Sequence, residues 1–369
     1  MDILGGQAVQ AARLLEKLAE EPSLEVDFLP INPRLPGLFH QLQKIKYLRT
    51  ILTSFAYVLS LLLRVYRYDV IHVFSASYFS FVLAPTPAIL IAKLYGRKVL
   101  LNYHSGEAED HLQRWRRTAI PTLRLVDSLI VPSEYLVRVF ADFGLEAHAI
   151  YNLIDTDRFH FRARVPLRPL FLSNRNLESH YGVDCVLRAF SIIQASIPEA
   201  RLTIVGDGSE RQTLQTLARE LNLQNTTFKG QVEPESIAGQ YDSADVYLNG
   251  SEIDNQPLSI LEAFACGLPI VTTDPGGIPD MVTDGKSGMV VSRSDYKEMA
   301  ERALRLLNDG SLAMQMIEEG RRECLKYSWT AVRGAWVTTY HELQQEKSLA
   351  EGDAEAKTQP TSESKILTR

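Results

Sequence analysis

A chain of 369 residues, 45% of them hydrophobic, is long enough to bury two cores of ordinary domain size. Its formal net charge of −6 argues against a protein that binds nucleic acid through bulk positive charge. Three widely spaced cysteines, Cys185, Cys266 and Cys324, form neither a paired framework nor a CxxC metal motif, so we expect a reducing, cytoplasmic setting.

Neither a secretory leader nor a membrane-spanning helix is expected. Residues 1–6 are too few to hold a charged region followed by an apolar core. The most apolar run, residues 51–63, contains Thr53, Ser54 and Ser60 and falls short of the roughly 20 residues that cross a bilayer.

Helices and strands alternate through the first half of the chain. A helix that opens at Gly6 should bury Val9, Ala12, Leu15 and Leu18, which recur at helical spacing. Strands that alternate with helices predict a parallel sheet in an α/β domain. The expected strands are 25–31, 70–74, 98–103, 128–131 and 147–151, and the expected later helices are 46–66, 111–125 and 133–143.

The second half repeats this pattern after a linker. Residues 155–168 carry four arginines and a proline without an apolar period, which indicates the connection between two domains. The polar tail after Glu346 lacks aromatic residues, so we expect it to be disordered. The expected strands are 169–173, 201–205, 226–229 and 244–249, and the expected helices are 183–196, 210–221, 234–241, 295–307, 312–326 and 329–345.

The segment 254–272, DNQPLSILEAFACGLPIVT, predicts a nucleotide site. Proline is favoured at the first position of a helix, so Pro257 should open one and leave the amides of Leu258 and Ser259 free to bind an anion. Glu262 lies one turn further and leans back toward that end. Its carboxylate could accept hydrogen bonds from both hydroxyls of a ribose. The alternative is that Glu262 only complements the helix dipole.

The same segment resembles the signature of the retaining GT-B glycosyltransferases of family 4, in which seven residues separate two acids. The pair here is Asp254 and Glu262, with Asp in place of the usual Glu. Residues 275–280 and 284–288 are similar to loops further along in that family, and the resemblance covers most of residues 5–345. It implies an α/β fold of two Rossmann-like domains facing across a cleft. The implied segments are an acceptor-side domain at 1–162, a nucleotide-sugar domain at 163–328, a helix that packs back at 329–347, and the tail at 348–369.

The resemblance implies three catalytic residues. Asp254 corresponds to the acid that approaches the transferred sugar; it is one methylene shorter, and a turn or cap role is an equal alternative. Arg175 corresponds to the arginine that binds the diphosphate, for which a planar fork is suited, although it could be a surface arginine. His104 follows a strand, where α/β sheets place ligands, and corresponds to the histidine near the sugar; the alternative is a structural histidine.

The donor-binding residues implied by the resemblance come from both halves. Gly5 and Gly6 match a loop that lets the backbone approach phosphate, or they open a helix. Lys229 and Gly230 end a strand where the family holds the base, or the glycine merely ends a strand. The family's lysine near Arg175 is absent. The positions that could have held it carry His180 and Tyr181. The remaining donor-binding residues that the resemblance implies are Pro257, Leu258, Ser259 and Glu262.

In the family a strand precedes the glycine loop, whereas only residues 1–4 do so here. We therefore expect the first strand to be missing or very short, through a misplaced start codon or a truncated form. An in-frame extension upstream in the gene would confirm the first explanation, and an upstream stop codon would exclude it.

The implied reaction moves a sugar, with retention, from a UDP- or GDP-sugar to an acceptor hydroxyl in glycan, polysaccharide or glycolipid synthesis. No cofactor, metal ion or nucleic acid is expected, and the acceptor would be a glycan or a lipid-linked glycan. The arginines at 114, 116 and 117 form either a patch for the inner membrane surface or a solvated helix face. A sugar-nucleotide epimerase or hydrolase and a non-catalytic scaffold subunit remain as alternatives.

Overall fold

The computed structural model describes residues 6–33, 46–75 and 77–358, with side chains omitted at 46, 47 and 348–358. Gly5 and the expected short first strand lie outside these residues. Contacts divide the chain into two units. Unit 1 comprises Met1–Phe28, Tyr103–Arg116 and Ile130–Arg333, and unit 2 comprises Leu29–Asn102, Arg117–Leu129 and Gly334–Arg369. The division does not follow the single expected boundary after residue 162.

Unit 1 is built on a six-stranded parallel sheet in the order β10-β9-β8-β5-β6-β7. Its central strands are buried on both faces, as expected for a sheet covered by helices on both sides. The chain order reverses between β5 and β8, which is where such sheets bind ligands. The strands are β5 (Leu170–Asn174), β6 (Arg201–Val205), β7 (Thr226–Gly230), β8 (Val246–Asn249), β9 (Ile270–Thr273) and β10 (Met289–Val291).

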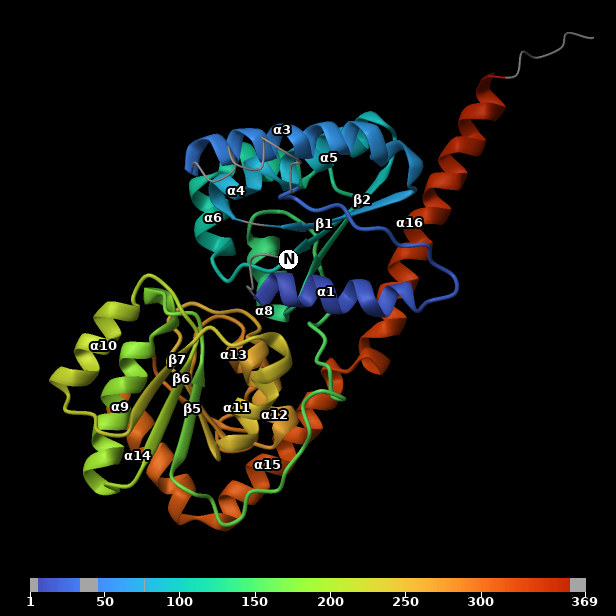
Figure 1. The fold of residues 1–369 in the computed structure, drawn as a ribbon. Helices are drawn as coiled ribbons and strands as arrows, with labels where there is room; N and C mark the ends of the chain where they lie inside the picture. Colours follow the sequence, from blue (N-terminus) through green and yellow to red (C-terminus); the bar gives the residue numbers. More distant parts are fainter. Residues whose placement is uncertain (1–5, 34–45, 76, 359–369) are drawn as a thin grey trace, which may run out of the picture. The chain divides into compact units, whose positions relative to one another are not determined.

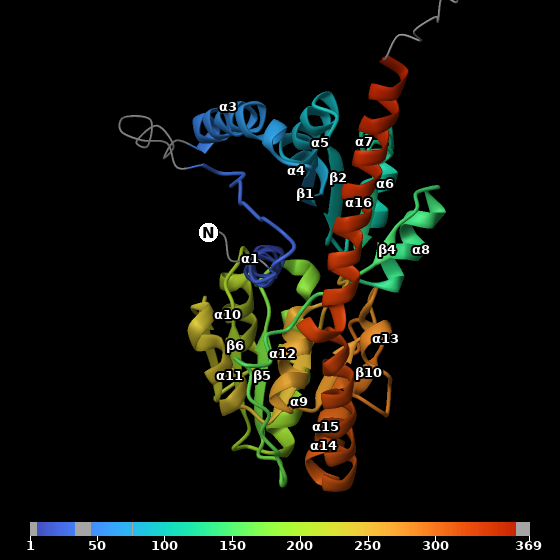
Figure 2. The same cartoon turned by 90° about the vertical axis from the view of Figure 1, so that its right-hand side faces the viewer.

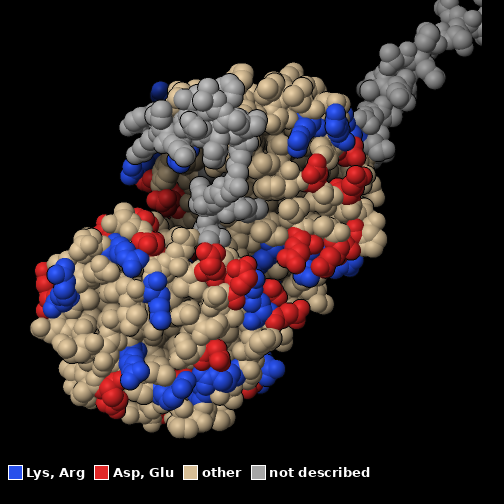
Figure 3. All heavy atoms as spheres, in the orientation of Figure 1, with Lys and Arg blue, Asp and Glu red and all other residues tan. Residues whose placement is uncertain are grey.

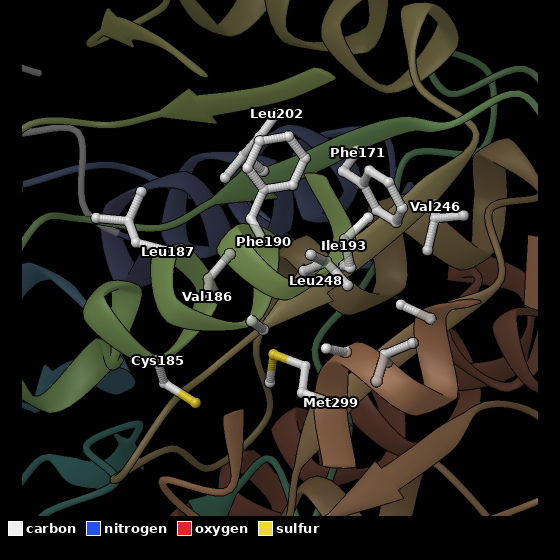
Figure 4. Close-up of a cluster of buried hydrophobic side chains, with 14 of the residues drawn as sticks. Phe171, Cys185, Val186, Leu187, Phe190, Ile193, Leu202, Val246, Leu248 and Met299 are labelled. Atoms are coloured by element: carbon white, nitrogen blue, oxygen red, sulfur yellow. The ribbon is translucent and has the colours of Figure 1, made fainter. Parts of the chain in front are cut away.

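Helices cover both faces of this sheet (Figure 1). One hydrophobic core joins the strands to α9 and α14, where Phe190, Ile193 and Met299 pack on Phe171 and Leu248 (Figure 4). A second core lies under α12 on the other face. The first face carries α9 (Val183–Ser196), α10 (Arg211–Glu220) and α14 (Tyr296–Asn308), and the second carries α11 (Ile237–Ser243), α12 (Leu258–Cys266) and α15 (Gly310–Cys324).

Three further helices of unit 1 come from the first half of the chain. The expected helix at 111–125 is instead two helices, because the chain leaves helical geometry at Trp115. The next expected helix, at 133–143, is confirmed as α8, and Ser133 caps its first turn. The helices are α1 (Gly6–Ala19), α6 (Ala108–Arg114) and α8 (Glu134–Asp142); α13 (Ile278–Met281) adds a short turn further on.

The buried face of α1 differs from the expected one. Gln10 is buried because its amide hydrogen-bonds both the carbonyl and the amide of Leu153, at 2.7 and 3.0 Å. Arg13 is buried because it pairs with Glu262. The polar partners of Gln10 and Arg13, and not apolar spacing alone, therefore determine which face of α1 is buried. The buried residues are Gln10, Arg13, Leu14 and Leu18, whereas Val9 and Leu15 are half-buried and Ala12 is exposed.

The N-terminal sheet has the order β1-β2-β3-β4. The expected strand at 25–31 is wrong: this stretch is irregular, and Phe28 and Ile31 are each 44% exposed, so its apolar residues find no core. The elements are β1 (Val70–Ser75), β2 (Lys98–Tyr103), β3 (Ser128–Val131) and β4 (His148–Ala149), with α3 (Lys46–Arg64), η1 (Val65–Arg67), α4 (Tyr78–Leu83), α5 (Pro85–Leu94) and α7 (Arg116–Leu123).

The last element, α16 (Trp329–Thr358), is one long helix (Figure 2). From Gly334 onward it belongs to unit 2. The Tyr340 hydroxyl lies 2.6 Å from Nδ1 of His72 on β1, and the Trp336 ring stacks on the same imidazole. This confirms the expected helix at 329–345 and shows that it packs on β1 through aromatic side chains. The expected disorder from residue 348 is wrong as far as Thr358, because that stretch is rich in helix-favouring Ala, Glu and Lys. Residues 359–369 lie outside the described part.

Candidate functional site

The candidate site lies in unit 1 where the strand order reverses. Arg175 follows β5, Asp254 lies on the loop after β8, and α12 begins at Leu258. The carboxyl ends of parallel strands meet at one edge of the sheet, so these residues come from distant parts of the chain to one place.

Two loops hold the backbone of Asp254 by close approach. Gly276 has φ +54°, and a Cβ there would lie 2.0 Å from the Asp254 carbonyl oxygen. A Cβ on Gly106 would lie 3.0 Å from the Asp254 carbonyl carbon. A side chain at Gly276 would therefore displace the Asp254 turn. This gives a physical reason for the glycines in the two stretches 104–106 and 275–277.

The start of α12 offers free backbone amides. Pro257 is the N-cap and Leu258 the first helical residue, which corrects the expected position of the proline by one residue. The Ile260 amide bonds the Pro257 carbonyl at 3.1 Å. Within the described part of the chain, the amides of Leu258 and Ser259 have no acceptor. They point out of the helix start, where the dipole favours an anion.

Arg175 brings a fixed positive charge to this helix start. Its Nη1 donates to Ser259 Oγ at 3.2 Å, its Nη2 pairs with Asp254, and Tyr181 stacks on it with the guanidinium carbon 4.1 Å from the ring centroid. Its Nε has no acceptor among the described residues. Burial lowers the pKa of Arg175 and the carboxylate of Asp254 raises it, with a net rise, so the side chain stays charged.

Asp254 is fully engaged by its own surroundings. One carboxylate oxygen accepts from the Ser251 hydroxyl at 3.0 Å and from Arg175, and the other accepts from the Asn255 amide at 3.0 Å. A carboxylate held in this way orients the guanidinium that it pairs with.

Glu262 is 6% exposed and also paired. Arg13 Nη2 donates to Oε1 at 3.1 Å, and the Tyr241 hydroxyl donates to Oε2 at 3.0 Å. Burial raises the pKa of Glu262, and the charge of Arg13 lowers it, with a net rise. Burial also raises the pKa of Tyr241 well above its ordinary value. Each carboxylate oxygen keeps a lone pair that could accept from a ligand hydroxyl.

Two other expected residues, Gly6 and His104, come from the first half of the chain. A Cβ on Gly6 would contact Leu258 Cδ1 at 3.9 Å, which places the start of α1 against the start of α12. His104 follows β2 and is partly exposed, but its Nε2 is shielded from solvent. Burial lowers the pKa of His104 to about 4, so its imidazole is neutral at physiological pH.

The other expected residues lie on β7 and α6. Lys229 is exposed and has no ion pair among the described residues. Gly230 is buried, and its carbonyl accepts from the Gly206 amide at 2.9 Å. Arg114 is exposed and pairs with Asp110 at 2.7 Å, as expected for a solvated helix face.

Three contributors could not be expected from the motifs. Apolar spacing assigns the buried face of α1 to other residues, so the only signal for Arg13 is its i, i+3 spacing from Gln10. Tyr181 stands at a position that could have held the family's lysine, and this pattern gives no sign that its ring stacks on Arg175. Tyr241 lies on α11 and carries no local signal. Within the described part of the chain, no three His, Cys, Asp or Glu side chains are placed to hold a metal ion.

Two family models divide the chain between them. The model "Glycosyltransferase Family 4" matches residues 4–158, and "Glycosyl transferases group 1" matches residues 156–323. A GDP-mannose-dependent alpha-(1-6)-phosphatidylinositol monomannoside mannosyltransferase of Mycolicibacterium smegmatis is 31% identical over 65% of this chain and 68% of its own length. The sulfoquinovosyl transferase SQD2 of Arabidopsis thaliana is 26% identical, over 72% of this chain and 55% of its own. The chain thus spans between 55% and 68% of these two relatives.

Solved structures agree with this assignment at the level of the fold. Anabaena HepE in complex with UDP-glucose has a TM-score of 0.67 at 17% identity, covering 78% of this chain and 82% of HepE. Sucrose-phosphate synthase from Thermosynechococcus elongatus has a TM-score of 0.67 at 20% identity, over 92% and 94%. Given these matches and the two parallel-sheet domains, the chain belongs to the glycosyl transferases group 1 family and has the GT-B fold.

Proposed function

We propose that the chain is a retaining, metal-independent glycosyltransferase that moves a sugar from a UDP- or GDP-sugar to an acceptor hydroxyl in glycan, polysaccharide or glycolipid synthesis. One observation carries the proposal. The free amides of Leu258 and Ser259, the cation of Arg175 and the carboxylate of Glu262 gather at the start of one helix. A nucleoside diphosphate requires this combination of anion-binding groups and a hydroxyl acceptor.

Positive groups at the helix start would stabilise the departing diphosphate. As the glycosidic bond to phosphate breaks, negative charge grows on the leaving oxygen, and preorganised donors aimed at it lower the barrier. Arg175 is already oriented by Asp254 and supported by the Tyr181 ring. Its Nε, together with the two helix amides, would contact the diphosphate. Asp254 then acts on Arg175 as a positioning residue.

The other proposed contacts concern the sugar and the nucleoside. Glu262 would accept from the ribose hydroxyls, and the backbone at Lys229 and Gly230 would border the base. The neutral imidazole of His104 can donate or accept a hydrogen bond with a hydroxyl of the transferred sugar. Gly6 would let the backbone approach the donor beside Leu258.

A reducing cytoplasmic location is supported by the cysteines. All three are buried and unpaired, and burial raises the pKa of each thiol to about 12. The names of the relatives support a lipid-linked acceptor, because the mycobacterial relative acts on a phosphatidylinositol mannoside. We therefore propose a lipid-linked acceptor and a peripheral contact with the inner membrane face.

A non-catalytic scaffold subunit is the second candidate. It is favoured by one observation: both acids of the motif are already paired with arginines of this chain, Asp254 with Arg175 and Glu262 with Arg13. A scaffold would use these pairs only for stability, and it would bind no nucleotide.

Nucleotide binding and release separate the candidates. We expect a thermal shift with UDP- or GDP-sugars, and nucleotide release that requires an acceptor; release without acceptor would instead indicate a hydrolase or epimerase, and no binding would indicate a scaffold. Arg175→Met should lower kcat/KM at least a hundredfold, since a charged contact that strengthens in the transition state is worth roughly 3 kcal/mol. Arg219→Met, on the exposed face of α10, is the matched control. Product NMR tests retention, and chelator treatment tests metal independence.

A further inference from the structure

Helix α3 and its continuation are apolar on two opposite sides. One ridge, with residues four apart, is buried in unit 2. The opposite ridge is exposed: Ile51 by 66%, Phe55 by 70%, Leu59 by 45% and Leu63 by 58%. By length and composition the helix from Leu48 to Arg67 could cross a bilayer, although residues 51–63 alone were too short. The buried ridge is Thr53, Tyr57, Leu61 and Val65.

Contacts along its length keep this helix on the surface of unit 2. The Tyr57 hydroxyl donates to the Ala84 carbonyl at 3.3 Å, and the Tyr95 hydroxyl donates to the Leu62 carbonyl at 3.0 Å. The Tyr66 and Tyr95 rings lie 6.1 Å apart, so the exposed ridge continues onto the end of α5. A helix held at this many points does not leave the unit to span a membrane; it presents its outer ridge as a surface.

The surrounding segment is basic in an otherwise acidic chain. Residues 28–106 contain nine lysines and arginines and a single acid, Asp69, while the whole chain has a net charge of −6. Arg49, Arg64 and Arg67 are exposed on α3 and η1 beside the apolar ridge. By contrast, acidic and basic side chains are interspersed on the face of unit 1 that Figure 3 shows. The apolar ridge and the positive charge therefore occur together in one segment.

We propose that the outer ridge of α3 docks unit 2 onto an anionic lipid bilayer, with the helix lying in the plane of the interface. Apolar side chains would enter the boundary between headgroups and acyl chains, Tyr66 and Tyr95 would lie at headgroup level, and the arginines would bind anionic headgroups. The positive charge of this segment favours an anionic bilayer as the partner. A second copy of this chain, docked through the same segment, would bring two positively charged surfaces together. The inference rests on the proposed function only for the side of the membrane.

Vesicle sedimentation of the full chain tests the proposal. We expect binding to vesicles of phosphatidylcholine with 30% phosphatidylglycerol, and at least tenfold weaker binding to pure phosphatidylcholine. Ile51→Gln with Phe55→Gln should weaken binding to the anionic vesicles at least tenfold. These side chains are exposed, so the variant should keep its melting temperature. The matched control is Met314→Gln with Leu325→Gln, which removes from unit 1 two apolar side chains that are 50% and 61% exposed.

A second variant isolates the electrostatic part. Arg49→Gln with Arg64→Gln should reduce binding to anionic vesicles severalfold and flatten its dependence on salt. The proposal is overturned if the unaltered chain ignores anionic vesicles at low salt, or if the α3 variant and its unit 1 control bind equally. It is also overturned if the α3 variant instead dissociates a lipid-free dimer. Donor binding, measured by thermal shift without lipid, should survive in all variants, so either proposal can fail alone.

Discussion

Arg13 and Glu262 form an ion pair in which both side chains are more than 90% buried, with 3.1 Å between Nη2 and Oε1. Removing one partner of such a pair leaves a buried charge uncompensated and costs about 3–5 kcal/mol. We therefore expect Arg13→Met to lower the free energy of unfolding by about that amount at pH 7.5. Urea denaturation followed by circular dichroism measures it.

The decrease in the free energy of unfolding caused by Arg13→Met should be smaller at pH 5 than at pH 7.5. Without Arg13, burial acts on Glu262 alone and raises its pKa further. A carboxyl whose folded pKa lies above its unfolded value adds stability below the unfolded pKa and loses it as pH rises through the folded pKa. Adding Glu262→Gln to the variant should recover part of the loss. Equal losses at both pH values, or additive effects of the two substitutions, would contradict this account.

His104 should make the stability of the folded protein decrease in acid. Burial lowers its pKa from 6.5 to about 4, so the unfolded chain takes up a proton before the folded chain does. The stability it contributes is complete above pH 6.5 and is lost as pH falls toward 4. Between pH 7.5 and 5 this amounts to about 2 kcal/mol. His104→Asn should flatten the dependence by that amount, whereas His148→Asn, at an exposed position, should not; matching slopes in both variants would refute the assignment.

At this scale the sequence predicts residues that belong to one local motif and misses their distant partners. Asp254, Leu258, Ser259 and Glu262 could be placed together because one loop and one helix carry them. Arg13 could not be linked to Glu262, because 249 positions separate them and only the packing of α1 brings them together.

Among the elements, the loop at Gly276 should control the Asp254 turn. A Cβ at Gly276 would lie 2.0 Å from the Asp254 carbonyl oxygen, so Gly276→Ala must move that turn and with it Arg175. We expect at least a tenfold loss of donor affinity, measured by isothermal titration. The matched control is Gly285→Ala, which also has positive φ but has no atom within 4 Å of its Cβ. It should lose only about 1–2 kcal/mol of stability and keep its donor affinity.

If both glycine variants lose donor affinity equally, the close approach at Gly276 has no special role. Elements with strong apolar runs, such as β8 and α12, could be predicted because burial on all sides requires a nearly continuous run of apolar residues. The rotation of α1 and the irregular stretch at 25–31 could not, because polar pairing decided the first and the lack of a packing face decided the second.

For the whole molecule, the two units raise the question of whether they unfold together. Every group proposed to bind the donor diphosphate and ribose lies in unit 1, and so do all three cysteines. Trp115 and Trp329 belong to unit 1 and Trp336 to unit 2. A single boundary after residue 162 does not describe these units, because each unit combines segments that are distant in sequence. Contacts between such segments cannot be predicted from composition.

We expect a nucleotide-sugar to stabilise unit 1 selectively. A ligand at a hundred times its Kd raises the free energy of unfolding of the unit that binds it by about 2.7 kcal/mol. In a chain carrying Trp115→Phe and Trp329→Phe, thiol labelling during a urea titration reports unit 1 and Trp336 fluorescence reports unit 2. The thiols, whose pKa burial raises to about 12, should stay unreactive to higher urea when donor is present, while the Trp336 midpoint stays fixed. Equal shifts of both probes would mean that the two units unfold as one cooperative body.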